Sequence, residues 1–277
     1  MLSWPDALAA AGCLAVIAIV IRARHLAGAW ATAGGVAQEA ALLSGLYGLW
    51  QFAGSFTVVS TAGALPRARW LWNAEQLLHL PDEAAVQRPF LPHPVLVQGF
   101  NLYYDILHFP VLGICLIWLY ARHRECYPPV RTTVALFTGA SLLIQLIPVA
   151  PPRLLPGTGL VDTAVRYGQS VYSWHGGFDA DQFSAMPSVH AGWALIVALA
   201  VIGVSRSRWR WLAAAYPALT LLVIVVTANH FWLDGVAAGL LVTMALAVQR
   251  LGRMIRSGNS WARPQASPVP GKISVRS

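Results

Sequence analysis

The chain has 277 residues, of which 57% are hydrophobic and only 11% are charged, whereas soluble domains carry roughly 25% charged residues. This composition excludes a water-soluble globular protein. The formal net charge of +8 comes from arginines that lie between apolar segments, and no basic domain is present that would bind a nucleic acid.

Long apolar blocks recur along the chain and predict transmembrane helices. They cover residues 7–21, 36–59, 102–120, 130–149, 189–204, 211–228 and 233–248. Each block approaches the roughly 20 residues that a helix needs to cross a bilayer. We therefore expect an all-α integral membrane protein with about seven transmembrane helices. Six spans is the alternative, because the first block is short and only residues 229–232 separate the last two.

The first apolar block carries its charges in the order of a retained helix. Asp6 precedes the block, and Arg22 and Arg24 follow it. A secretory signal has its positive charges in front of the apolar stretch. We therefore expect a membrane helix whose amino terminus lies outside the cell.

The basic residues divide unevenly between alternate loops of a seven-span chain. Of the 19 Lys and Arg residues, 14 fall on one side, in the loops after the first, third and fifth blocks and in the tail. The basic side is expected to be cytoplasmic. This orientation predicts a multi-pass plasma-membrane protein with an external amino terminus and a cytoplasmic carboxyl terminus. Residues 1–250 would form one transmembrane catalytic domain, and residues 251–277 a basic, disordered tail.

Two regions outside the main blocks carry polar groups. Residues 67–80 interleave Trp and Leu with Arg and Glu, which favours a helix lying in the membrane interface. Asn101, Tyr104 and His108 fall at helical positions i, i+3 and i+7 of the third block. Because polar residues inside a membrane usually face a cavity or a partner, this stripe predicts either a substrate headgroup pocket or a hydrogen-bond network between helices.

Three short motifs lie at ends of apolar blocks, all on the Arg-poor side. Arg153 stands between prolines after the fourth block, Ser188 and His190 open the fifth, and His230 and Asp234 lie between the sixth and seventh. Taken singly, each has a structural reading as a surface arginine, a helix cap or a pair that ties two helices together. Their expected convergence on one membrane face favours a catalytic site instead.

The residue types at this face supply complementary chemistry for phosphoryl transfer. If a helix starts near residue 230, Asp234 lies one turn from His230 and accepts its Nδ1–H, which leaves Nε2 free as a nucleophile. His190 provides a proton donor. Arg153 and the amide groups of the helix that opens at Ser188 would hold phosphate oxygens. The loop of residues 157–182 is expected to cover the site.

Arg153, the run from Pro187 to His190, and His230 with Asp234 resemble the three-part signature of the type 2 phosphatidic acid phosphatase superfamily. The fuller strings AMPSVHAGW, from Ala185, and NHFWLDGVA, from Asn229, are more similar to the branch that contains inositol phosphorylceramide synthases and their bacterial relatives. The resemblance covers residues 98–248. It implies a six-helix phosphatase-type core, to which the chain adds one helix, and a bacterial source.

The resemblance also implies a mechanism without metal or cofactor. His230 attacks phosphorus and forms a phosphohistidine, His190 protonates the leaving group, and Asp234 orients His230. The chain departs from the broad superfamily at three places, with Leu146 instead of a lysine, Val223 and Ile224 instead of a Ser-Arg pair, and Val189 instead of the glycine usual in phosphatases. These departures favour the synthase-like branch.

The sequence therefore predicts a phosphotransferase that acts on a lipid phosphate or a phospholipid headgroup, with a polyol or water as acceptor. The catalytic residues are expected to be His230, His190 and Asp234, the phosphate-binding residues Arg153 and Ser188, and the pocket residues Asn101, Tyr104 and His108. A lipid-phosphate phosphatase, with water as acceptor, is the first alternative. A transporter or scaffold is the second, although no inverted repeat is evident. The oligomeric state is left open.

Overall fold

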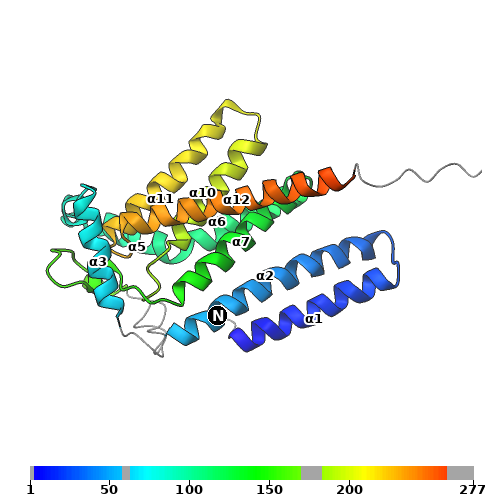
Figure 1. The fold of residues 1–277 in the computed structure, drawn as a ribbon, viewed down its shortest axis with the longest axis horizontal. Coiled ribbons are helices and arrows are strands. Elements are labelled where there is room, and N and C mark those ends of the chain that lie inside the picture. The colour runs from blue at the N-terminus through cyan, green and yellow to red at the C-terminus, as the bar shows by residue number, and fades with distance from the viewer. Residues whose placement is uncertain (1–2, 58–62, 170–182, 261–277) are drawn as a thin grey trace, which may run out of the picture.

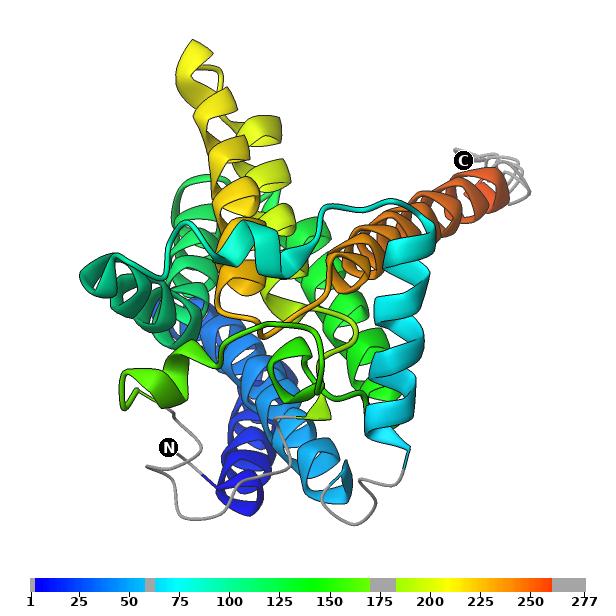
Figure 2. The same ribbon diagram turned by 90° about the vertical axis from the view of Figure 1, so that its left-hand side faces the viewer.

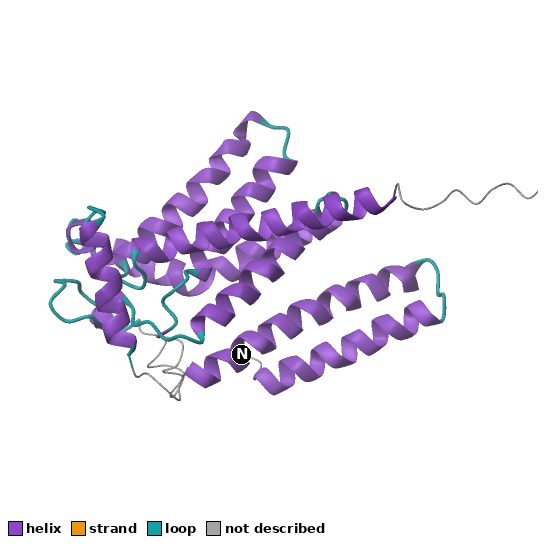
Figure 3. Ribbon diagram, viewed as in Figure 1, coloured by secondary structure: helices purple, strands orange, loops and turns teal. Residues whose placement is uncertain are grey.

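The computed structural model describes residues 3–57, 63–169 and 183–260. Within these ranges the chain is helical and contains no β-strand, apart from one isolated bridge between Val149 and Ser184 (Figure 3). The expected all-α class is confirmed.

The helices follow one another in a single series. They are α1 (Trp4–Ala23), α2 (Ala29–Thr57), α3 (Ala64–Leu77), α4 (Glu83–Gln87), α5 (Pro94–Leu102), the π-helical turn η1 (Tyr103–Leu107), α6 (His108–Arg122), α7 (Tyr127–Gln145), the 3-10 turn η2 (Pro152–Leu154), α8 (Thr163–Arg166), α10 (Val189–Val204), the 3-10 segment η4 (Arg208–Ala214), α11 (Ala215–Val226) and α12 (Trp232–Ser260). Each predicted apolar block falls largely within one helix or one continuous helical run of this series.

Several helices have the length and composition to cross a membrane. Four helical runs of the described residues are long and apolar enough, namely 4–23, 94–122, 208–226 and 232–255, and the apolar helix α10 is shorter. A multi-pass helical membrane protein follows from these segments. The count of seven and the orientation remain predictions.

The third span begins earlier than the apolar pattern indicated. Its helix starts at Pro94, where a proline suits the first helical position, rather than at residue 102. The π turn η1 then interrupts the α-helical phase at Tyr103–Leu107. Pro110 lacks the N–H that would reach the carbonyl of Ile106, and its ring would crowd that carbonyl. The sequence thus has a local reason for a wider turn at this place.

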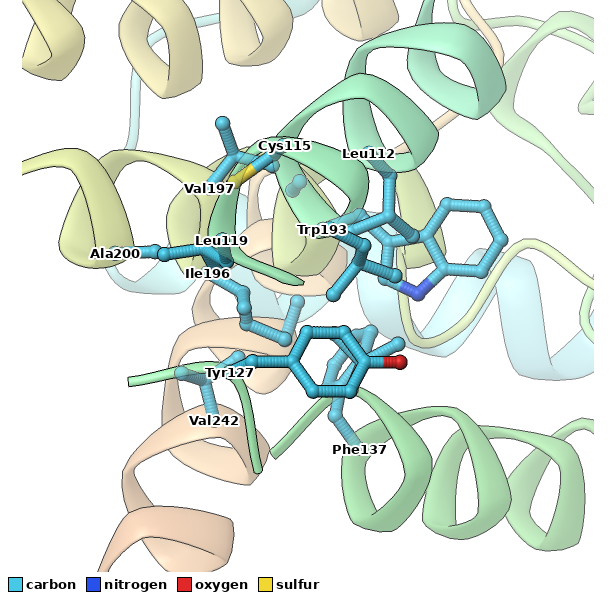
Figure 4. Packing of buried hydrophobic residues seen from close by; sticks show 14 of the residues in the cluster. Leu112, Cys115, Leu119, Tyr127, Phe137, Trp193, Ile196, Val197, Ala200 and Val242 are labelled. Carbon is cyan, nitrogen blue, oxygen red and sulfur yellow. The ribbon is translucent and has the colours of Figure 1, made fainter. Parts of the chain in front are cut away.

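The main apolar core lies between α6, α7, α10, α11 and α12. Its most buried members include Leu119 and Phe137, both 0% exposed (Figure 4). Gly192 of α10 packs on the Phe137 ring of α7, because a Cβ at Gly192 would lie 1.9 Å from the Phe137 Cζ atom. This close approach fixes the start of α10 against α7.

The first two helices form a hairpin at one side of this core. α1 and α2 run side by side, and α2 reaches the remainder of the chain at α7 (Figure 1). Glu39 of α2 accepts a hydrogen bond from the Tyr127 hydroxyl at 2.9 Å and pairs with Arg131. The link between hairpin and core is therefore polar.

Helix α3 lies across one end of the bundle, where most of the long connections also gather (Figures 1 and 2). Ala64, Ala68 and Leu71 of α3 pack on a second, smaller core formed with the connections and the start of α12. The predicted helix at residues 67–80 is thus present, and its position in the membrane interface remains a prediction. α12 continues to Ser260, beyond the predicted start of the tail at residue 251, and residues 261–277 lie outside the described ranges.

Candidate functional site

Three connections meet at this end of the bundle and carry the predicted motifs. The stretch after α7 bonds to the stretch before α10, since Val149 N donates to Phe183 O at 2.7 Å and Ala185 N donates to Val149 O at 3.3 Å. The same stretch after α7 bonds to the α11–α12 connection, through Arg153 N and Ala228 O at 3.0 Å. Figure 2, seen from this end, shows these connections crossing near the centre. Backbone bonds thus fix the relative positions of the motifs.

His230 has a defined tautomer in this arrangement. Its Nδ1 lies 2.6 Å from the carbonyl oxygen of Ala185 and 3.3 Å from Oδ2 of Asp234. A carbonyl oxygen can only accept, so Nδ1 carries the proton and the neutral ring keeps its lone pair on Nε2. The Tyr104 hydroxyl lies 3.5 Å from that Nε2. His230 is only 4% exposed, and its Nε2 faces the Tyr104 hydroxyl.

This geometry corrects two details of the sequence analysis. α12 starts at Trp232, so His230 precedes the helix instead of lying within it. The nearest acceptor for Nδ1–H is the Ala185 carbonyl, and Asp234 is the second. The expected pairing of His230 with Asp234 is present. The Ala185 carbonyl, from a segment distant in sequence, also orients the ring.

Asp234 is fully buried and serves the backbone as well as the imidazole. Its Oδ2 accepts from Phe231 N at 2.9 Å, in the manner of the third residue of a capping box. Its backbone carbonyl accepts from Ser188 N at 3.2 Å, which ties α12 to the start of α10. Its Oδ1 has no hydrogen-bond partner within the described residues. A carboxylate in this position stabilises positive charge on His230.

His190 stands in the first turn of α10 beside two side chains of the third span. The Ser188 hydroxyl caps this turn by accepting from Ala191 N at 3.3 Å. The His190 ring stacks on Tyr104 with centroids 4.2 Å apart, lies 4.1 Å from the ring of His108, and is 5.6 Å from the ring of His230. The two histidines of the motifs therefore both lie beside Tyr104.

The π turn carries Tyr104 beside both histidines of the motifs. Its ring stacks on His190, and its hydroxyl lies 3.5 Å from Nε2 of His230. Wider turns of this kind release backbone groups from the regular helical pattern and are frequent at functional sites. The ring of His190 is held by its contacts with Tyr104 and His108, and its Nδ1 is buried with no hydrogen-bond partner within the described residues.

Arg153 contacts the residue that immediately precedes His230. Its side chain is 4% exposed, its Nη1 donates to Oδ1 of Asn229, and its Nε lies 3.3 Å from Oδ2 of Asp162. Asn229 immediately precedes His230 and donates to the Thr227 hydroxyl at 2.9 Å. These contacts fix the guanidinium plane, which is what two-point recognition of a phosphate requires.

The predicted pocket residues divide into two groups. Tyr104 and His108 contact His190, whereas Asn101 bonds to Thr163 at 2.8 Å and to Gln169 at 2.9 Å. The π turn changes the helical phase between these positions, so the three side chains do not form one continuous stripe. Asn101 anchors the α8 region to the third span in this structure, and a substrate contact for it stays a prediction.

Sequence reasoning did not identify several groups that shape the site. The Ala185 carbonyl leaves no sequence signal, because every residue carries such a group. Asn229 belonged to the longer motif string, and Asp162 stands at a helix N-cap, where aspartate is common. Asp105, to which no role was given, interacts electrostatically with Arg153. The covering loop predicted at residues 157–182 lies partly outside the described residues, from 170 to 182.

Comparison with known proteins gives one match. The sequence model of the PAP2 superfamily matches residues 69–248, a stretch that contains every candidate site residue. No curated protein and no solved structure matches the chain.

Proposed function

The chain belongs to the PAP2 superfamily, and we propose that it is an integral-membrane phosphotransferase acting on a lipid phosphate or a phospholipid headgroup through a phosphohistidine. The observation that carries this proposal is the state of His230. The Ala185 carbonyl fixes the proton of this buried imidazole on Nδ1. The lone pair on Nε2 is therefore available for nucleophilic attack.

In the first step, Nε2 of His230 attacks phosphorus and the bond from phosphorus to the leaving oxygen breaks. The positive charge that develops on the ring is stabilised by Asp234, 3.3 Å from Nδ1. His190 gives a proton to the leaving oxygen. Arg153 offsets the charge of the equatorial phosphate oxygens.

In the second step, the oxygen of an acceptor alcohol attacks the phosphohistidine, the P–N bond breaks, and His190 takes the acceptor's proton. A polyol acceptor corresponds to the synthase-like branch of the family. Water in the same place gives a lipid-phosphate phosphatase, which shares the first step. Val223 and Ile224, which replace the usual Ser-Arg pair, are buried in the core at 0% and 1% exposure, so no cation reaches the phosphate from that turn.

The test of function is turnover by the purified protein in lipid nanodiscs. Phosphatidic acid and phosphatidylinositol serve as donors, with EDTA present, with and without inositol as acceptor. Acceptor-dependent transfer supports the phosphotransferase, and release into water alone supports the phosphatase. A donor labelled with 32P should leave an acid-labile, base-stable label on the protein, as expected of a phosphohistidine.

Two variants are compared, one that changes a histidine in the site and a control that changes a histidine far from it. His230→Ala should abolish both turnover and label, because it removes the nucleophile. His25→Asn changes an exposed histidine in the α1–α2 connection, at the end of the molecule far from the site, and asparagine tolerates its positive φ of 49° (Figure 1). Full turnover by His230→Ala would eliminate the proposed mechanism.

We place the site on the extracytoplasmic face of a bacterial plasma membrane, because the loops at the opposite end carry most of the arginines. In a chain with Cys13, Cys115 and Cys126 replaced by serine, Val165→Cys and Trp209→Cys offer exposed positions at the two ends. A membrane-impermeant maleimide should label residue 165 in intact cells and residue 209 only after permeabilisation. The reverse labelling would mean that the site faces the cytoplasm.

A further inference from the structure

Two glutamates are buried behind the nucleophile motif without a cationic partner. Glu75 of α3 and Glu83 of α4 are each 1% exposed. Fully buried carboxylates are rare unless paired, because the loss of hydration costs the ionised form several kcal/mol. No Lys, Arg or His of the described residues forms a salt bridge with either. Such a costly arrangement calls for a compensating interaction.

The compensation comes from the two carboxyl groups themselves. Burial, together with the neighbouring carboxyl group of Glu83, raises the pKa of Glu75 to about 9. No N–H or O–H donor of the described residues reaches Oε2 of Glu75 or Oε1 of Glu83. One proton held between the two groups satisfies both oxygens and leaves the pair with a single negative charge.

The other oxygen of Glu75 reaches the start of α12. Its Oε1 accepts from Leu233 N at 2.7 Å, one residue before Asp234. Trp232 Nε1 donates to Pro81 O at 2.8 Å, in the connection between the two glutamates. Backbone N–H groups in the first turn of a helix have no partner within that helix, so Glu75 supplies one that α12 itself lacks. Helix α3 and the α3–α4 connection therefore hold the first turn of α12 at one point each.

We propose that the Glu75–Glu83 carboxyl pair is a positioning element for the His230–Asp234 nucleophile pair, holding the first turn of α12 while the two glutamates share one proton. This inference rests on the proposed function. Neither glutamate touches the reacting atoms. They act through Leu233 and through the electrostatic environment of Asp234.

The charged groups around the pair determine what happens when the proton is lost. Glu83 of α4 and Asp234 of α12 are the titratable groups that act on Glu75, and His230 acts on Asp234 in turn. Ionisation of the second glutamate would place two negative charges beside the buried Asp234. Repulsion between like charges in a low-dielectric region would then loosen the hold of α3 and α4 on α12.

The sign of the pH dependence follows from the direction of the shift. The pKa of Glu75 rises from 4.5 to about 9 on folding, so the folded chain binds this proton more tightly than the unfolded chain does. The contribution to stability is complete below the unfolded pKa and is lost as the pH rises through the folded one. Activity should therefore fall on the alkaline side, in the range where the pair loses its proton.

The experiment compares glutamine and leucine at the same positions in the full-length protein in nanodiscs. Glu75→Gln and Glu83→Gln replace the shared proton by an amide N–H, and should keep kcat at neutral pH within roughly threefold while the alkaline fall moves to higher pH. Glu75→Leu removes the acceptor of Leu233 N and should lower kcat roughly tenfold or more with little change in KM.

Gln87→Leu is the matched control for stability alone. Gln87 is 1% exposed on the same segment and bonds to backbone groups of Val161 and Val226, but not to α12. It should lower Tm without moving the alkaline fall. An unchanged pH profile in Glu75→Gln, or wild-type kcat in folded Glu75→Leu, would overturn the positioning role.

An infrared measurement separates this proposal from the proposed function. The C=O stretch of a protonated carboxyl should be present in the wild type, absent in Glu75→Gln, and lost on titration near the pKa of about 9. Because this readout needs no substrate, it reports the shared proton even if no lipid phosphate is turned over. Absence of the band in folded wild-type protein at neutral pH would contradict the shared proton.

Discussion

The α1–α2 hairpin and the loop-bearing end of the core are held to the molecule by different kinds of contact. In α1 the buried residues are Ala7, Ala18 and Ile21, and large apolar side chains such as Ile19 remain 65% exposed. At the site end, polar groups are buried and hydrogen-bonded to partners far away in sequence, as His230 is to Ala185.

This difference indicates which contacts of the chain tolerate substitution and which do not. Apolar contacts between helices in a bilayer compete with equally apolar lipid tails, so the packing of α1 against α2 tolerates change. The polar link of α2 to α7 through Glu39 is partly exposed. A buried polar group has no such substitute, because losing its partner costs the full penalty of desolvation. The PAP2 match begins at residue 69 and leaves the hairpin out, which agrees with this division.

After loss of the nucleophile His230 itself, the largest effect is expected from His190→Ala, a change at the site end. Loss of a general acid should lower kcat roughly 10²- to 10⁴-fold with a smaller change in KM. Donors with a good leaving group, such as a p-nitrophenyl phosphoester, need little protonation and should lose much less. Equal losses for both kinds of donor would show that His190 acts in some other way.

Arg153→Lys should have the next largest effect. Lysine keeps the charge but cannot contact Asn229 and Asp162 together and hold two phosphate oxygens in one plane. The loss of transition-state stabilisation should be about 1.5–3 kcal/mol, measured as a fall in kcat/KM. An unchanged kcat/KM would remove Arg153 from the phosphate site.

Gly192→Ala tests how tightly α10 must approach α7 beneath the site. Its Cβ would lie 1.9 Å from Cζ of the Phe137 ring, which is fully buried. We expect destabilisation by about 1–3 kcal/mol, seen as a lower Tm. The matched change Gly139→Ala, where the new Cβ meets no atom within 4 Å, should leave Tm nearly unchanged. Similar Tm values for the two variants would mean that the close approach is not needed.

The smallest effect is expected at the hairpin, from Glu39→Gln. This change weakens the partly exposed contacts to Arg131 and Tyr127 and should cost about 1 kcal/mol or less. Turnover per folded molecule should stay at the wild-type value. A loss of turnover comparable with that of Arg153→Lys would show that the hairpin takes part in function and that the division drawn above is wrong.

The sequence by itself determined the helical membrane class and the motif residues. Apolar blocks of sufficient length leave few alternatives in a bilayer, because only helices satisfy their own backbone groups within a single segment. The sequence also indicated the candidate site residues, because polar side chains with few chemical roles stand at the ends of apolar blocks. These residues are Arg153, His190, His230 and Asp234.

Only the tertiary structure decided how these residues are oriented. The carbonyl that fixes His230 belongs to Ala185, and backbone groups carry no sequence signal. The π turn moved His108 and Asn101 to different partners, because a change of helical phase depends on local backbone geometry that periodicity cannot show. The hydrogen bond from Leu233 N to Glu75 joins residues 158 positions apart. Such a contact exists only once the chain has folded.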